Sequence, residues 1–134
     1  MDGVQFTRTT FVSASYEVVV IHISASRSES ITFSASMESP QQSRVTTRHN
    51  ELILNGRTSD HEGVPGKIRF QSIADFAAKG GSVSAFDSTV VVHNADNVTI
   101  RISIASNFRK YNDIGGDEQS LARRYLTRAE NRSY

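Results

Sequence analysis

The 134-residue sequence contains no cysteine and no tryptophan, and it has only two prolines. Without cysteine the chain forms no disulfide, no thiolate zinc site and no cysteine nucleophile, although this leaves its compartment open. Fifteen basic and fourteen acidic residues nearly cancel, so no overall field favours nucleic acid or an anionic membrane. There is no run of 18 apolar residues to span a bilayer and no recognisable signal peptide. We therefore expect one domain that binds neither nucleic acid nor membrane.

The common motifs of catalytic and cofactor sites are missing as well. There is no G-x-S-x-G, P-loop or G-x-G-x-x-G pattern, and the four histidines form no H-E-x-x-H arrangement. Asp60, His61 and Glu62 could serve as a metal or acid–base site. A solvated loop is the favoured interpretation, because alternation in an extended segment would point His61 away from both carboxylates. The acidic residues around Gly115 and Gly116 lack the spacing of an EF-hand calcium loop, so we expect no metal and no cofactor.

What the sequence does contain is a series of short alternating segments rich in β-branched residues, separated by turn residues. Such segments, spaced by about 8–12 residues, are typical of a sandwich or barrel. We predict an all-β fold, an antiparallel β-sandwich of about eight or nine strands with one C-terminal α-helix. The expected strands cover residues 4–11, 16–25, 31–38, 45–47, 51–56, 67–77, 82–86, 89–93 and 98–105.

The last of these strands has the clearest alternation. Val98, Ile100, Ile102 and Ile104 share one face, which predicts a strand with one buried and one wetter side. A polar and aromatic loop follows, and Asp117 then caps a helix over residues 118 to about 131. One apolar stripe runs along that helix, made of Leu121, Ala122, Tyr125, Leu126 and Ala129. These patterns divide the chain into a sandwich over residues 1–116 and a helix over 117–134.

Five segments, in this order, are similar to one enzyme family. They read F-T-R-T-T-F-V-S-A-S-Y-E-V-V-V-I-H-I-S-A-S, S-I-T-F-S-A-S-M-E-S-P, L-I-L-N-G-R-T-S-D-H-E-G-V-P-G-K-I-R-F, G-G-S-V and S-N-F-R-K-Y-N-D-I-G-G-D-E. The ordered set resembles glycoside hydrolase family 95, the inverting α-L-fucosidases. The similarity is to the second half of their N-terminal β-sandwich domain and the start of its connector helix. Tyr16-Glu17 departs from the Pro-Asp that the family commonly has there.

The resemblance implies an architecture but brings no catalytic residue to this chain. In the family, the general acid and the residues that activate water lie in an α-helical barrel, which we expect to be absent here, as is the first half of the β-domain. An inverting mechanism needs two carboxyl functions separated by a water, and this sequence offers no such pair. The resemblance therefore implies a non-catalytic portion that supports and contacts the barrel of an enzyme acting on terminal α-L-fucosides or L-galactosides. The alternative is a stand-alone sandwich that binds carbohydrate or protein.

Two loops, residues 57–66 and 106–113, are the ones we expect nearest to a partner barrel or a sugar. The candidate contact residues are His61, Glu62, Phe108, Arg109 and Tyr111. The two rings could stack on a sugar while Arg109 and Lys110 bond its hydroxyls. The favoured alternative is that the rings simply anchor the loop onto the strand ends.

Half a sandwich would leave strand edges unpaired, and the apolar stripe of the helix would need a partner that a missing barrel cannot supply. We therefore expect a homo-oligomer formed through strand edges or the helix, with exchange of these elements as one route. The family resemblance also implies a periplasmic or extracellular location in bacteria.

Overall fold

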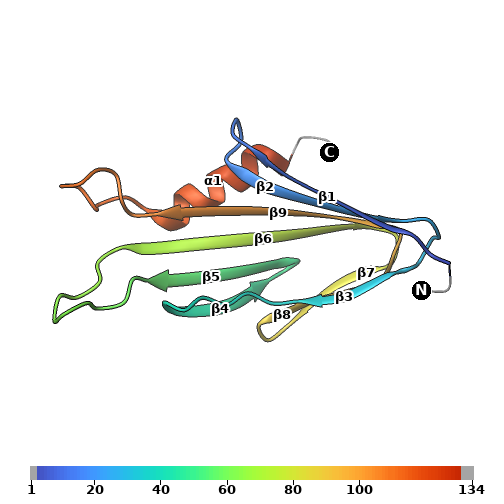
Figure 1. Cartoon of the computed structure of the whole chain (residues 1–134), viewed down its shortest axis with the longest axis horizontal. Coiled ribbons are helices and arrows are strands. Elements are labelled where there is room, and N and C mark those ends of the chain that lie inside the picture. Colours follow the sequence, from blue (N-terminus) through green and yellow to red (C-terminus); the bar gives the residue numbers. More distant parts are fainter. Residues whose placement is uncertain (1–2, 131–134) are drawn as a thin grey trace.

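The computed structural model of the chain describes residues 3–130, which form nine β-strands followed by one helix (Figure 1). The predicted all-β class with a C-terminal helix is confirmed. The elements, in chain order, are β1 Phe6–Ser13, β2 Val18–Ala25, β3 Ile31–Ala35, β4 Gln42–Arg48, β5 Glu51–Arg57, β6 Arg69–Lys79, β7 Ser82–Phe86, β8 Thr89–Ala95, β9 Asn97–Ser106 and α1 Glu118–Glu130.

The strands form two antiparallel sheets of unequal size. The large sheet has the order β1-β2-β9-β6-β5-β4, and the small sheet has the order β3-β8-β7. Three of the reversals between adjacent strands use residues with positive φ, namely His49 at 53°, Asp87 at 58° and the pair Gly80-Gly81 at 73° and 64°. The turns at His49 and Asp87 fix the register of the hairpins β4-β5 and β7-β8, whereas Gly80-Gly81 leads the chain from the large sheet into the small one.

Several strand boundaries differ from the prediction by two or three residues. Val4 lies before β1, Tyr16 lies in the turn before β2, and Met37 lies beyond β3 although its side chain still packs against the core. Ile68 precedes β6 and is only half-buried, whereas Ala74 faces the core as expected. Frayed strand ends give weak sequence signals, because alternation there is carried by one or two residues.

The main core lies between the two sheets. It joins residues that alternate along each strand, among them Leu52, Phe76 and Val98 of the large sheet and Val90 and Val92 of the small sheet. Each of these side chains is at most 3% exposed. Burial on this scale supplies the main driving force for bringing the two sheets together.

Strand β9 is covered on both faces, which corrects the prediction of one buried and one wetter side. Val98 and Ile100 face the small sheet, whereas Ser103 and Ala105 are buried on the opposite face. Ile104, expected to be buried with its neighbours, is 63% exposed. Burial therefore changes along the strand. The small sheet covers the start of its inner face, and the helix covers the end of its outer face.

The helix α1 packs against the outer face of the large sheet. Ala122 and Leu126 contact Ile73 and Ala105, and Ala129 contacts Val18 and Val20. The expectation that the apolar stripe lacks a partner within this chain is therefore wrong. The helix ends at Glu130, and Asn131 and Arg132, expected at or beside its end, lie outside the described residues. No helix among residues 3–130 is long and apolar enough to cross a membrane.

Candidate functional site

Both loops expected to make contacts lie at the same end of the large sheet. Arg57 at the end of β5 pairs with Arg69 at the start of β6, and Phe70 pairs with Ser106 at the end of β9. The β5–β6 loop, residues 58–68, and the β9–α1 loop, residues 107–117, therefore begin side by side. We call these two segments the loop end; both project beyond the large sheet at the left of Figure 1.

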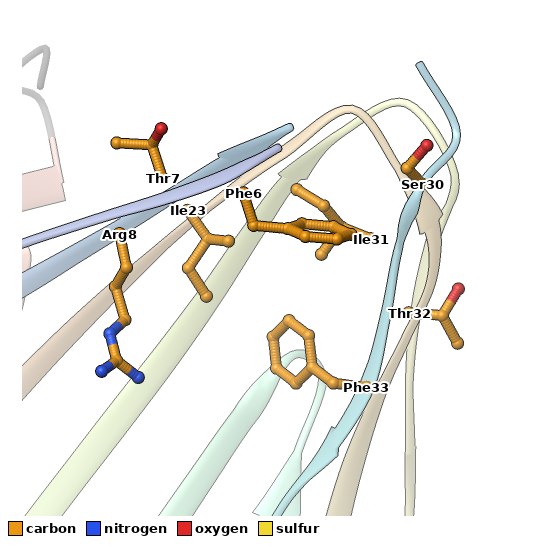
Figure 2. A pocket seen from close by; sticks show the side chains of 8 residues that line it. All are labelled: Phe6, Thr7, Arg8, Ile23, Ser30, Ile31, Thr32 and Phe33. Atoms are coloured by element: carbon orange, nitrogen blue, oxygen red, sulfur yellow. The ribbon is translucent and has the colours of Figure 1, made fainter. Parts of the chain in front are cut away.

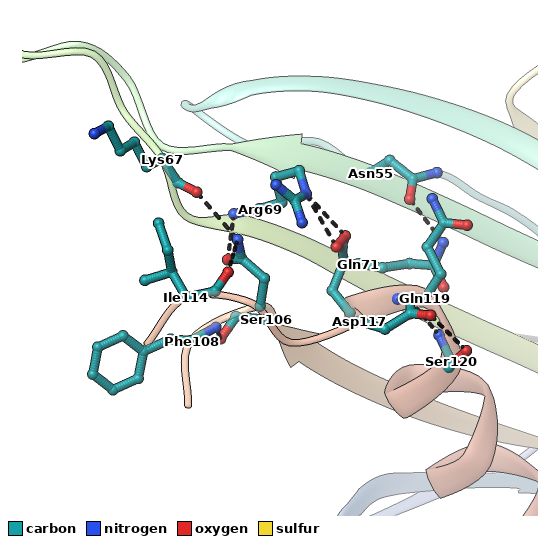
Figure 3. A network of polar contacts seen from close by, with 12 residues as sticks. Asn55, Lys67, Arg69, Gln71, Ser106, Phe108, Ile114, Asp117, Gln119 and Ser120 are labelled. Atoms are coloured by element: carbon teal, nitrogen blue, oxygen red, sulfur yellow. Dashed lines mark hydrogen bonds and ion pairs between the residues drawn. The ribbon is translucent and has the colours of Figure 1, made fainter. Parts of the chain in front are cut away.

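Asn107 holds the bases of the two loops together, a role that the sequence did not reveal. Its side chain is fully buried. The Oδ1 atom accepts a hydrogen bond from the Arg69 amide at 2.8 Å, and the Nδ2 group donates to the carbonyls of Lys67 at 3.2 Å and Ile114 at 3.0 Å. Figure 3 shows these bonds converging between the loops. A buried amide with all its bonds made fixes the local geometry, so the loop end has a rigid base.

The 58–68 loop ends in a tight turn that carries His61 and Glu62. His61 and Val64 exchange two backbone hydrogen bonds of 2.9 Å, with Glu62 at φ 50° and Gly63 at φ 80° between them. Positive φ at both central residues is the pattern of a type I′ turn. The segment is thus a tight turn. The prediction that His61 points away from both carboxylates had assumed an extended segment. Both His61 and Glu62 are exposed at the tip of the loop.

The base of this loop depends on Gly66. A Cβ at that position would lie 1.8 Å from the carbonyl oxygen of Thr58, a contact that no side chain permits. The Gly66 amide donates to Oδ1 of Asp60 at 2.9 Å. Asp60 is therefore engaged in shaping the loop.

The 107–117 loop forms a second small hairpin that displays the two aromatic rings. Lys110 and Asp113 exchange backbone hydrogen bonds, and Tyr111 sits at the tip between them. Tyr111 is 90% exposed and Phe108 is 51% exposed. The interpretation that both rings anchor the loop is therefore wrong for Tyr111, because the anchoring is done by Asn107. Arg109 reaches Asp113 at 3.9 Å, a largely exposed pair that contributes little to stability.

The two carboxylates where this loop meets α1 are both engaged in structural contacts. Oδ1 of Asp117 accepts from the amides of Gln119 and Ser120, both at 3.1 Å, and Oδ2 accepts from the Ser120 hydroxyl at 2.8 Å. The bonds from Ser120 hold the pKa of the Asp117 carboxyl below its ordinary value of 3.8. Glu118 is buried and pairs with Arg69 at 3.2 Å (Figure 3). Within residues 3–130 no group of three or more histidines or carboxylates is placed to bind a metal ion.

A small hollow of about 180 Å³ lies where the second loop meets the helix. Phe108 and Arg109 line it from the loop, and Asp117, Leu121 and Arg124 line it from the start of α1. The structure thus brings Phe108 and Arg109 to one site. It does not bring His61 and Glu62 into that hollow, since neither residue lines it.

The structure contains a second group of charges, beneath the helix on the outer face of the large sheet. Glu51, Asp75 and Arg101 lie opposite one another on β5, β6 and β9. Asp75 pairs with Arg101 at 3.5 Å, and Glu51 pairs with Arg123 of α1. Burial raises the pKa of Asp75 above 3.8, with Arg101 opposing the rise and Glu51 and Glu130 adding to it. Because each carboxylate has its own arginine, this group joins helix to sheet and offers no free acid and base.

These features place the chain in the class of antiparallel β-sandwich domains that present loops at one end. Comparison with models of known families matches residues 1–111 to the glycosyl hydrolase family 65 N-terminal domain. The chain therefore belongs to that family of domains. A search of curated proteins gives no match. The glycoside hydrolase part of the sequence prediction, including its N-terminal β-sandwich, is thereby confirmed.

Proposed function

We propose that this chain is the non-catalytic β-sandwich portion of an α-L-fucosidase-like glycoside hydrolase, and that its loop end docks on the catalytic α-helical barrel. The full-length enzyme would hydrolyse terminal α-L-fucosides, with the acid and base supplied by the barrel. The ordered segments similar to family 95 support the fucosidase assignment, and the family match supports the coarser role of a glycoside hydrolase N-terminal domain.

The observation that carries the docking proposal is the exposed apolar surface of the loop end. Nine large apolar side chains are exposed among residues 3–130, and four of them lie in these two loops: Val64 at 65%, Phe108 at 51%, Tyr111 at 90% and Ile114 at 37%. Exposed apolar groups gathered on a rigid base are typical of a protein interface. Helix α1 begins at the same end, so a barrel seated there would contact both the loops and the start of the helix.

A stand-alone module that binds carbohydrate is the second candidate, and one observation favours it. Phe108 and Arg109 line the same hollow, so a ring face and a guanidinium are available together. A sugar could stack on the ring and accept hydrogen bonds from the arginine. The hollow of about 180 Å³ is smaller than the roughly 300–1,000 Å³ of ordinary ligand sites, which is why we rank barrel contact first.

The test is calorimetric titration of the chain with the catalytic barrel domain of a family 95 α-L-fucosidase whose own β-sandwich has been removed. We expect binding that the double variant Phe108→Ala/Tyr111→Ala weakens by roughly tenfold or more, because truncating aromatic anchors removes most of the contact energy. The matched control is Phe86→Ala, which removes an 82% exposed ring on β7 and should leave binding unchanged.

Two results would contradict the proposal. One is the absence of binding to the barrel, and the other is equal weakening by the control variant. A parallel titration with L-fucose separates the second candidate: binding of the sugar without the barrel, lost in Phe108→Ala, would identify a stand-alone carbohydrate module.

A further inference from the structure

A cleft of about 460 Å³ opens between the start of β1 and the start of β3. It lies at the other end of the large sheet from the loop end. Phe6 of β1 pairs with Ala25, and the neighbouring Ser24 pairs with Asn97 at the start of β9, whereas the loop end follows Ser106 at the end of β9. The volume is within the roughly 300–1,000 Å³ of ordinary ligand sites. The cleft is therefore large enough for a small molecule.

The two walls of the cleft are apolar. Phe6 and Ile23 line it from the large sheet, and Ile31 and Phe33 line it from β3. In Figure 2 the rings of Phe6 and Phe33 point into the space between the strands. Ile31 is 3% exposed, and Ile23 and Phe33 pack against the main core. An apolar molecule in the cleft would thus rest on the core and cover the ring of Phe6, which is 48% exposed.

Arg8 is the one charged residue among the described residues that line this cleft. It pairs with Ile23 across the β1–β2 ladder, so its side chain lies on the same side of β1 as Phe6. Figure 2 shows Phe6 and Arg8 on that side and Thr7 on the other. No ion pair or side-chain hydrogen bond joins Arg8 to another described residue. Its guanidinium therefore keeps its donors for a ligand.

The hydroxyl groups along the cleft are directed elsewhere. Thr32 donates to Oδ1 of Asn94 at 3.3 Å and accepts from the Asn94 amide at 2.9 Å. The Ser30 hydroxyl donates to the Ser28 carbonyl at 3.2 Å. In Figure 2 the side chains of Thr7 and Thr32 point out of the cleft. A polar group on a ligand would therefore meet Arg8, whereas a molecule with many hydroxyls would find few partners.

We propose that this cleft binds a small aromatic carboxylate, with its ring between Phe6 and Phe33 and its carboxylate on Arg8. Phenyl side chains favour an aromatic partner through edge-to-face and offset contacts. A guanidinium matches a carboxylate with two parallel hydrogen bonds. None of the described residues that line the cleft is acidic, so no lining group repels the anion. The site is separate from the loop end and does not depend on docking there.

The first test is an NMR titration of the isotope-labelled chain with 2-naphthoate and with 2-naphthamide, its uncharged counterpart of the same shape. We expect saturable amide shifts at the start of β1 and at residues 30–33, with a Kd for naphthoate of roughly 0.1–1 mM. Naphthamide should bind about fivefold more weakly or worse, because it lacks the charge-assisted bonds to Arg8. No saturable shift at several millimolar, shifts centred on the loop end, or equal affinity for the two probes would overturn the proposal.

The second test compares two arginine variants. Arg8→Gln should weaken naphthoate binding about fivefold or more and leave naphthamide binding unchanged, because it removes the charge that only naphthoate uses. The matched control is Arg44→Gln, which removes an exposed arginine from β4 at the far edge of the large sheet and should change neither affinity. Arg8 is exposed as well, so both variants should keep the Tm of the wild type.

A third variant, Phe6→Ala, should weaken the binding of both probes, because it removes one aromatic wall. Naphthoate binding that is unchanged in Arg8→Gln or in Phe6→Ala, or an equal loss in Arg44→Gln, would overturn the proposal. None of these measurements involves the barrel or glycosidase activity, so their outcome is independent of the proposed function.

Discussion

Asn107 is the residue on which the geometry of the loop end depends. Besides its three side-chain bonds, its amide donates to the Arg69 carbonyl and its own carbonyl accepts from Gly116. It therefore connects the start of β6, the end of β9 and the approach to α1. A short polar side chain just after a strand gives no sequence signal for this role, because its partners are backbone groups far away along the chain.

We predict that Asn107→Ala lowers the free energy of unfolding by roughly 2–4 kcal/mol, since buried backbone groups lose their partners. Urea denaturation measures the change. The control Asn112→Ala removes an exposed amide from the same loop and should change stability very little. Equal losses in the two variants would show that Asn107 is not the structural centre of the loop end.

Asp75 makes the stability of the chain depend on pH in an unusual direction. Burial raises its pKa in the folded state above the ordinary value of 3.8, so the folded chain holds this proton more tightly than the unfolded chain. Where the folded state binds more protons, stability falls as pH rises. The contribution of Asp75 is therefore most favourable below pH 3.8 and is lost as pH rises through the raised pKa.

The corresponding variant is Asp75→Asn, which cannot ionise. We predict that its free energy of unfolding, relative to that of the wild type, increases from pH 3 to pH 7. Urea denaturation at each pH measures this difference. Asp117→Asn is the matched comparison, because the pKa of Asp117 is lowered and the sign reverses. That variant should become less stable than the wild type as pH rises. The same trend in both variants would contradict the assignment of the charges.

Among the elements, α1 and β9 show most clearly what the sequence predicts and what it does not. The apolar stripe of the helix, its cap at Asp117 and the alternation of β9 were all readable from neighbouring residues. The surface that the stripe covers could not be predicted in this way, because Ile73 and Ala105 belong to strands far away in sequence. For the same reason the sequence could not show that Ser103 is buried and Ile104 exposed. Alternation gives the two sides of a strand but not what lies against each side.

We predict that Leu126→Ala lowers the free energy of unfolding by about 2–5 kcal/mol, because it opens a cavity between helix and sheet. Leu126 is fully buried, whereas its neighbour Thr127 is exposed. Thr127→Ala therefore serves as the control and should have little effect on chemical denaturation. If Leu126→Ala were equally mild, the helix would not be part of the folded core.

Considered as a whole, the chain presents the loop end beyond one end of the large sheet (Figure 1). The loop end combines a rigid base with exposed rings, which suits docking on a catalytic domain. Contact through these two loops was expected from the sequence. Their position side by side depends on strand order, which hydrophobic patterning does not encode.

We propose that this chain assists a glycoside hydrolase without carrying its catalytic groups. The most direct measurement is the rate of hydrolysis of an aryl α-L-fucoside by the chain alone, by the barrel domain alone and by the two together. We predict no turnover above buffer for the chain alone, and a higher rate for the mixture than for the barrel alone. Turnover by the isolated chain that a point substitution within it abolishes would contradict the claim.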